Sequence, residues 1–159
     1  MAGYIIANGE YAPFKEETEK LEERKDKAHK AAELLRELGY KEDCEEIKGL
    51  QDIWWDAHNE IKRYESYDYM GRYYITGYDA CYSCCGKTDG ITASGTKATV
   101  GRTVAMKNVP FGTKIYIDGI GERVVEDRGV SSGRVDVFCG NHSECYAITG
   151  YYDVFAVKG

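Results

Sequence analysis

The spacing of hydrophobic positions along the chain changes once, near residue 66. Before this point, apolar side chains recur every three or four residues, which is the period of an amphipathic helix. The earlier of two such stretches has Leu21, Ala28, Ala31, Leu35 and Leu38 in this pattern. The later stretch has Ile47, Leu50, Trp54, Ala57, Ile61 and Tyr64. We therefore predict an antiparallel two-helix hairpin over residues 13–66.

The residues between the two helical stretches predict where each helix stops and starts. Gly39 follows Leu38, and a glycine directly after a helix adopts the left-handed conformation without strain. The run Asp43-Cys-Glu-Glu46 resembles a capping box that opens the second helix. Trp55 points away from the seam that contains Trp54, so we expect the hairpin to bind a protein partner or to self-associate.

After Ser66 the apolar positions alternate with a period of two, which is typical of β-strands. Strands are expected at residues 72–78, 102–107, 113–118, 122–126, 134–138 and 151–157. One short helix is expected at residues 143–149. Six short strands and one helix predict a small closed barrel. The expected class is α+β, with a helical hairpin over residues 1–66 and a six-stranded β-barrel over residues 67–159.

Charge separates the two predicted domains and narrows the expected partners. The net charge of −6 comes from residues 1–66, with 11 Lys/Arg and 17 Asp/Glu, whereas the remainder has 10 of each. Neither part is basic, so nucleic acid is not an expected partner. No apolar run approaches the roughly 20 residues that span a bilayer. The first ten residues lack the features of a signal peptide, which predicts synthesis in the cytoplasm.

Two aspartates are the first candidates for chemistry. Asp127 and Asp136 are expected at the ends of two apolar β-type runs that a short Gly/Ser-rich loop joins. Strand ends beside a tight loop are places where a rigid scaffold presents side chains to a ligand. Aspartates at such positions also serve simply to cap turns.

Several short segments occur in an order that resembles a known family. They are Tyr78-Asp-Ala-Cys-Tyr-Ser-Cys-Cys-Gly86, Asp89-Gly-Ile-Thr-Ala-Ser-Gly-Thr96, Gly101-Arg-Thr-Val-Ala105, Val109-Pro-Phe-Gly-Thr-Lys-Ile-Tyr116, Glu126-Asp127, Arg134-Val-Asp136 and Asn141-His-Ser-Glu144. Together they resemble the three-aspartate (3D) domain of cell-wall enzymes from Gram-positive bacteria and their phages. The resemblance covers roughly residues 72–157.

The resemblance implies a double-psi β-barrel related to the membrane-bound lytic transglycosylase A. Such enzymes cleave the MurNAc–GlcNAc β-1,4 bond of peptidoglycan without water and leave a 1,6-anhydro-muramoyl end. By the same resemblance, Asp136 takes the catalytic position and Asp127 a supporting one. One carboxyl suffices, because it protonates the leaving oxygen and then accepts the proton of the C6 hydroxyl. The expected substrate-binding residues are Thr92, Ser94, Thr96 and Tyr78, where hydroxyls and a flat ring suit a sugar.

The resemblance leaves a choice of function. The expected role is a phage or prophage endolysin, or a virion-associated enzyme, that acts on the glycan strands of the bacterial cell wall. The family's first aspartate belongs in a region that here has Lys107 and Asn108. A cell-wall carbohydrate-binding barrel without catalysis is therefore the alternative, and a phage structural protein is a third.

The six cysteines leave three possibilities open. Cys81, Cys84 and Cys85 have the spacing of a zinc half-site, which Cys139, Cys145 or His142 could complete. Disulfides or free buried thiols are favoured over zinc, because a wall enzyme works outside the reducing cytosol. Cys44 falls on the predicted hairpin. No metal and no cofactor is assigned from the sequence.

Overall fold

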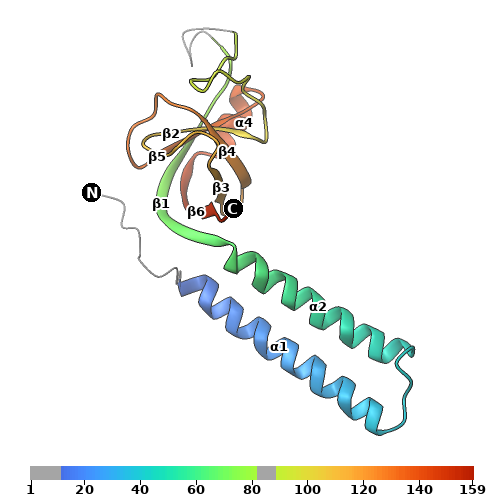
Figure 1. Ribbon diagram of the computed structural model, residues 1–159. Coiled ribbons are helices and arrows are strands. Elements are labelled where there is room, and N and C mark those ends of the chain that lie inside the picture. Colours follow the sequence, from blue (N-terminus) through green and yellow to red (C-terminus); the bar gives the residue numbers. More distant parts are fainter. Residues whose placement is uncertain (1–11, 82–88) are drawn as a thin grey trace. The chain divides into compact units, whose positions relative to one another are not determined.

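The chain folds as two compact units that divide between Ser66 and Tyr67 (Figure 1). A computed structural model describes residues 12–81 and 89–159. The first unit is helical and the second contains six strands and a short helix. This arrangement confirms the predicted α+β class with a hairpin followed by a six-stranded sheet. Among the described residues, no helix has the length and apolar character to cross a membrane.

The helical unit consists of α1 (Ala12–Glu37) and α2 (Glu45–Glu65). Gly39 ends the first helix as predicted, with φ at 87°. Tyr40 N donates to Leu35 O at 3.0 Å, and Gly39 N donates to Arg36 O at 2.9 Å. This pair of hydrogen bonds is the Schellman pattern, which satisfies two carbonyls at the end of the helix.

The predicted start of α2 is wrong in its details. The residue that caps the helix is Cys44 in an extended conformation, and its side chain makes no capping hydrogen bond. Asp43 lies one residue too early to reach the orphan amides of the first turn. Glu45 and Glu46 in the first turn still place negative charge at the positive end of the helix dipole.

The seam of the hairpin is close to the predicted one. The buried side chains are Leu21, Ala28 and Ala32 of α1 and Ile47, Ala57 and Ile61 of α2. Ala32 takes the place expected for Ala31, and Leu38 is 75 % exposed because α1 has already ended at Glu37. The alanines among these residues leave room for the larger leucine and isoleucine side chains of the seam. Trp55 is exposed, as its position beside the seam predicts.

The described residues of the second unit form six strands. They are β1 (Tyr67–Tyr78), β2 (Thr103–Met106), β3 (Lys114–Ile117), β4 (Gly121–Asp127), β5 (Arg134–Phe138) and β6 (Gly150–Val157). The hydrogen-bonded order is β1-β5-β2-β4-β3-β6, and β6 also pairs with β1, so the order returns to its start. The pairs β1–β5 and β2–β4 are parallel, and the other four are antiparallel.

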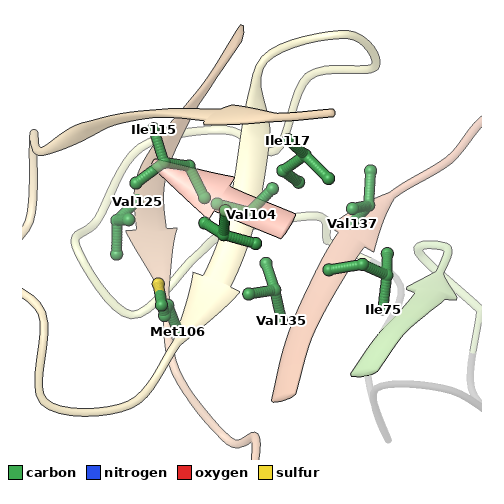
Figure 2. Packing of buried hydrophobic residues seen from close by; sticks show 9 residues of the cluster. Ile75, Val104, Met106, Ile115, Ile117, Val125, Val135 and Val137 are labelled. Atoms are coloured by element: carbon green, nitrogen blue, oxygen red, sulfur yellow. The ribbon is translucent and has the colours of Figure 1, made fainter. Parts of the chain in front are cut away.

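Every strand contributes to one apolar core (Figure 2). Its buried members are Ile75, Val104, Met106, Ile115, Ile117, Val125, Val135, Val137 and Val154. Successive side chains of a strand point to opposite faces, so the residues between these members face outward. On β5, for example, Val135 and Val137 point into the core, and Asp136 lies on the outer face.

The first strand is longer than predicted and has two partners. Its first part pairs with β6 in antiparallel fashion, from Tyr67 to Ile75, and its last part pairs with β5 in parallel, from Tyr74 to Tyr78. The register with β6 shifts between Tyr69 and Gly71, where φ is 130°. This bulge interrupts the period-two pattern, which is why the alternation predicted a start at residue 72.

A short helix, α4 (His142–Ala147), packs against the end of β1. Asn141 caps it, because its side chain accepts a hydrogen bond from Glu144 N at 3.0 Å. The contact requires a glycine at position 77. A Cβ there would lie 2.5 Å from Cys145 Cα and 2.8 Å from Cys139 Sγ.

Candidate functional site

Four residues lie in one row across neighbouring strands on the outer face of the sheet. Thr76 of β1 pairs with Asp136 of β5, and Asp136 pairs with Ala105 of β2. Ala105 in turn pairs with Asp127 of β4. Directly paired residues point to the same face. The two aspartates therefore flank Ala105, whose methyl group is the only side chain that β2 places between them.

A bulge in β4 brings Asp127 into this row. Val104 pairs with Val125, but the next residue, Ala105, pairs with Asp127, so Glu126 is the extra residue of the bulge. Without the bulge, Glu126 would lie opposite Ala105. Bulges commonly redirect a side chain beside a functional site.

The surroundings of Asp136 change the pKa of its carboxyl. Its side chain is half-buried, and Thr76 Oγ1 donates to its Oδ1 at 2.9 Å. Burial raises the pKa of Asp136 above its ordinary value, although the Thr76 hydrogen bond and the Arg134 charge oppose this and the Asp127 charge adds to it. Within residues 12–81 and 89–159, Thr76 is the only hydrogen-bond donor to this carboxyl, and Oδ2 is left for a ligand.

Asp127 is held by three donors. Tyr78 Oη donates to Oδ2 at 2.8 Å, and the backbone amides of Ala93 and Arg128 donate to Oδ1 at 2.8 and 2.9 Å. Through these hydrogen bonds Asp127 joins β1, β4 and the loop of residues 92–96.

The guanidinium of Arg128 donates its hydrogen bonds to backbone carbonyl oxygens and not to either aspartate carboxylate. It donates to the carbonyl oxygens of Met106 at 2.9 Å and of Val109 at 2.6 Å, and also to the Asp127 backbone carbonyl at 3.1 Å. It lies 3.8 Å from the ring centroid of Phe111. In the described part of the chain, no ion pair joins it to Asp127 or Asp136. The cation that acts on Asp136 is Arg134, two residues earlier on the same strand.

The loop of residues 92–96 brings three hydroxyls together. The side-chain oxygens of Thr92, Ser94 and Thr96 lie 3.0 Å from one another. Thr92 is buried and also bonds to Thr96 O, so its hydroxyl stabilises the loop. Ser94 and Thr96 are more exposed. They are the members of this set that a sugar could reach.

Tyr78 lies at the site but is not an open stacking surface. It is buried, its hydroxyl is bound to Asp127, and its ring meets Phe138 edge-on at 5.3 Å. Both rings, together with Asp127 and Ile91, line a small cleft of about 30 Å³. That volume holds about one water molecule. Tyr78 therefore positions Asp127.

An aromatic surface beside Asp136 was not predicted from the sequence. Tyr74 of β1 pairs with Arg134 of β5 and with Tyr151 of β6, so all three lie on the outer face, one step along from Asp136. The rings of Tyr74 and Tyr151 are 5.0 Å apart, and Arg134 lies 5.2 Å from the Tyr74 ring. Tyr151 is 65 % exposed. The signal was present in the alternation of β1 and β6, but only the strand order brings these rings to Asp136.

Glu126 is a buried carboxylate with a structural role. Arg102 donates two hydrogen bonds to its Oε1, at 3.0 and 2.8 Å, and Thr103 Oγ1 donates to Oε2 at 2.7 Å. Burial alone would raise the pKa of Glu126. The bonds from Arg102 and Thr103 and the Arg102 charge outweigh burial, so the pKa is lowered.

Among the described cysteines, Cys44, Cys139 and Cys145 are free thiols. Cys139 and Cys145 are buried beside Gly77, and Cys44 and Cys81 are partly exposed. Burial raises the pKa of both buried thiols, that of Cys145 to about 12. Neither is therefore a nucleophile at neutral pH. Cys84 and Cys85, which carried part of the zinc and disulfide hypotheses, lie outside the described residues.

Comparison with protein families, with curated proteins and with solved structures finds no match to this chain. Function must therefore be argued from the row of side chains around Asp136.

Proposed function

We propose that residues 67–159 form a double-psi β-barrel that cleaves peptidoglycan as a lytic transglycosylase, with Asp136 as its general acid and base. The observation that carries the proposal is the contrast between the two carboxyls. Asp136 is half-buried, has a raised pKa and keeps one oxygen for a ligand, whereas three donors hold Asp127. The two parallel pairs within a closed strand order support the barrel.

The geometry suits a reaction that needs a single acid. Protonated Asp136 donates its proton to the glycosidic oxygen as the bond from the muramoyl C1 breaks. The resulting carboxylate accepts the proton of the C6 hydroxyl, whose oxygen bonds to C1 and closes the 1,6-anhydro ring. Water is neither consumed nor released. A raised pKa keeps the acid protonated nearer to neutral pH, where it is needed.

The surroundings of Asp136 supply positioning and charge. Asp127 is the second carboxyl of the row, and a carboxylate at this place would favour a cationic, oxocarbenium-like sugar ring in the transition state. Tyr151 and Tyr74 form an aromatic surface next to Asp136 on which a sugar ring can stack. Ser94 and Thr96 offer hydroxyls on the side of Asp127. A glycan strand would cross the row from the aromatic surface to this loop.

The hairpin would serve as the anchoring or targeting part of a phage-type wall enzyme. Leu34 and Trp55 are exposed on it, at 60 % and 55 %. Exposed large apolar side chains of this kind favour binding to a protein partner or self-association. We place the site of action at the bacterial cell wall.

The deciding experiment is digestion of purified peptidoglycan followed by mass spectrometry of the soluble products. We expect anhydro-muramoyl ends from the wild type and a loss of about 10²–10⁴-fold in Asp136→Asn. Asp118→Asn is the matched control, because Asp118 is an exposed turn residue of the same unit. Reducing ends in place of anhydro ends would indicate hydrolysis. No products, with retained binding to cell walls, would establish the alternative of a carbohydrate-binding barrel.

A further inference from the structure

Three side chains of different chemistry meet at the edge of the sheet where β1 ends and α4 begins. Asp79 and Cys81 follow β1, and His142 is the first residue of α4. One possible ligand atom from each lies within 4.8 Å of the other two. The parallel pairing of Tyr78 with Phe138 explains the meeting, because the segments that follow two parallel strands emerge at the same edge.

The imidazole ring of His142 has a defined orientation. Its Nδ1 lies 2.8 Å from Asp79 Oδ2, and its Nε2 lies 4.0 Å from Cys81 Sγ. When Nδ1 donates its proton to the carboxylate, Nε2 directs a lone pair toward the sulfur. The Asp79 side chain is 14 % exposed and the His142 side chain 53 %, so the carboxylate is fixed in the protein and the ring is open to solvent.

We propose that Cys81 and His142 bind a Zn²⁺ ion, with Asp79 as the residue that orients the histidine. Tetrahedral zinc with Zn–S of about 2.3 Å and Zn–N of about 2.0 Å separates the two ligand atoms by about 3.5 Å. The observed 4.0 Å reaches this value with a shift of about half an ångström. A histidine whose second nitrogen is held by a carboxylate is the usual arrangement at zinc sites.

The ligand types select the ion. A thiolate and an imidazole suit zinc, whereas magnesium and calcium prefer oxygen ligands. The same three residues in this order would also suit a thiol nucleophile with a histidine base. The 4.0 Å between sulfur and nitrogen is the long limit of a hydrogen bond to sulfur, and the experiment below distinguishes the metal site from the nucleophile.

A bound ion would add a second link between two parts of the second unit that the contact between His142 and Asp79 already joins. It would tie the segment after Tyr78 to the start of α4, next to the contact between Gly77 and Cys145. Because Tyr78 also holds Asp127, the ion would stabilise one side of the glycan site. It would bind whether or not Asp136 is catalytic.

The test is a metal titration of the full-length protein after chelation under reducing conditions. Co²⁺ is added first, because a thiolate ligand gives a charge-transfer absorption, and Zn²⁺ is then added in competition. We expect saturation at about one ion per chain, loss of the signal on adding Zn²⁺, and a higher unfolding temperature with Zn²⁺. Asp79→Asn should weaken binding by about 10–100-fold.

Variants distinguish this site from other sites on the chain. Cys81→Ser and His142→Ala should abolish the cobalt signal, whereas Cys44→Ser and His58→Ala on the hairpin should leave it unchanged. His142 is exposed, so its replacement should not prevent folding. Binding by His142→Ala with wild-type affinity would overturn the proposal. So would a metal-free protein whose Cys81 is alkylated rapidly only when His142 is present, because that result identifies a thiol nucleophile.

Discussion

Thr76 donates its hydroxyl hydrogen bond to Asp136 across the β1–β5 pair, with the two oxygens 2.9 Å apart. This bond favours the ionised form of Asp136 and so lowers a pKa that burial raises. Thr76→Val should therefore raise the pKa of Asp136 further. A ¹³C NMR titration of the aspartate carboxyls measures the shift directly, and the acidic limb of any pH–activity profile should move the same way. Thr113→Val, away from the row, should leave the titration of Asp136 unchanged. A lower pKa of Asp136 in Thr76→Val would contradict the effect expected of this hydrogen bond.

The ionised side chain of Asp136 should lower the free energy of unfolding of the second unit at neutral pH. A carboxyl whose folded pKa lies above its unfolded one favours folding while it is protonated, and this contribution is lost as the pH rises through the folded value. Asp136→Asn removes the buried charge and keeps an oxygen that can accept from Thr76. Its second unit should therefore unfold at a higher temperature than the wild type at pH 7. The difference should shrink toward zero near pH 3. Circular dichroism melts across this range test both points, and a variant less stable at pH 7 would contradict them.

Glu126 should have the opposite effect on pH dependence. Its lowered pKa means that the ionised form stabilises the fold above the unfolded pKa, and that this contribution is lost as the pH falls through the folded pKa. Glu126→Gln should destabilise the second unit by about 1–3 kcal/mol at pH 7, because it removes the charged partner of Arg102 and Thr103. Urea unfolding at pH 7 and at acidic pH should show the difference narrowing in acid. Glu122→Gln, on an exposed position of the same strand, is the control.

Two glycines should respond in opposite directions to alanine. Gly77→Ala would place a methyl group 2.5 Å from Cys145 Cα. We therefore expect it to lower the free energy of unfolding of the second unit by about 1–3 kcal/mol. Gly49 lies inside α2 with no neighbour within 4 Å of an added Cβ. Gly49→Ala should stabilise the hairpin by roughly 0.5–1 kcal/mol. Thermal melts of both variants check the pair, and a neutral Gly77→Ala would show that α4 can move away from β1.

The alternation of hydrophobic and polar residues predicts most of the strands because each has one face in the core. Residues 134–138 are the clearest case, since Val135 and Val137 face inward on either side of the outward-facing Asp136. Two features cannot be predicted from the alternation. The bulge at Gly71 interrupts the pattern near the start of β1, and the residue that caps α2 makes no side-chain hydrogen bond that would mark the start of the helix.

The candidate site is only partly visible in the sequence. Asp127 and Asp136 stand out as acidic residues in two apolar runs beside a glycine-rich loop. The expectation that both lie at strand ends holds for Asp127, the last residue of β4, and is wrong for Asp136, which lies in the middle of β5 because that strand begins at Arg134. Their unequal roles depend on Ala93, Tyr78 and Thr76, whose hydrogen bonds follow from strand order and from the β4 bulge. Neither the strand order nor the β4 bulge can be recognised from the residues that surround it in the sequence. The aromatic pair beside Asp136 joins β1 and β6, whose partners are far apart in the chain.

The pairing of the first and last strands of the sheet also determines when this unit can fold. Residues 67–75 hydrogen-bond to residues 150–157, so the closing contacts have the largest sequence separation in the unit. Contacts of this kind slow folding, whereas the hairpin depends on neighbours close in sequence. During synthesis the helices can therefore form while the ribosome is still translating the strands. The sheet, and with it the complete row around Asp136, must wait for β6 to emerge. A nascent chain would thus carry the residues of both helices well before it carried the complete row around Asp136.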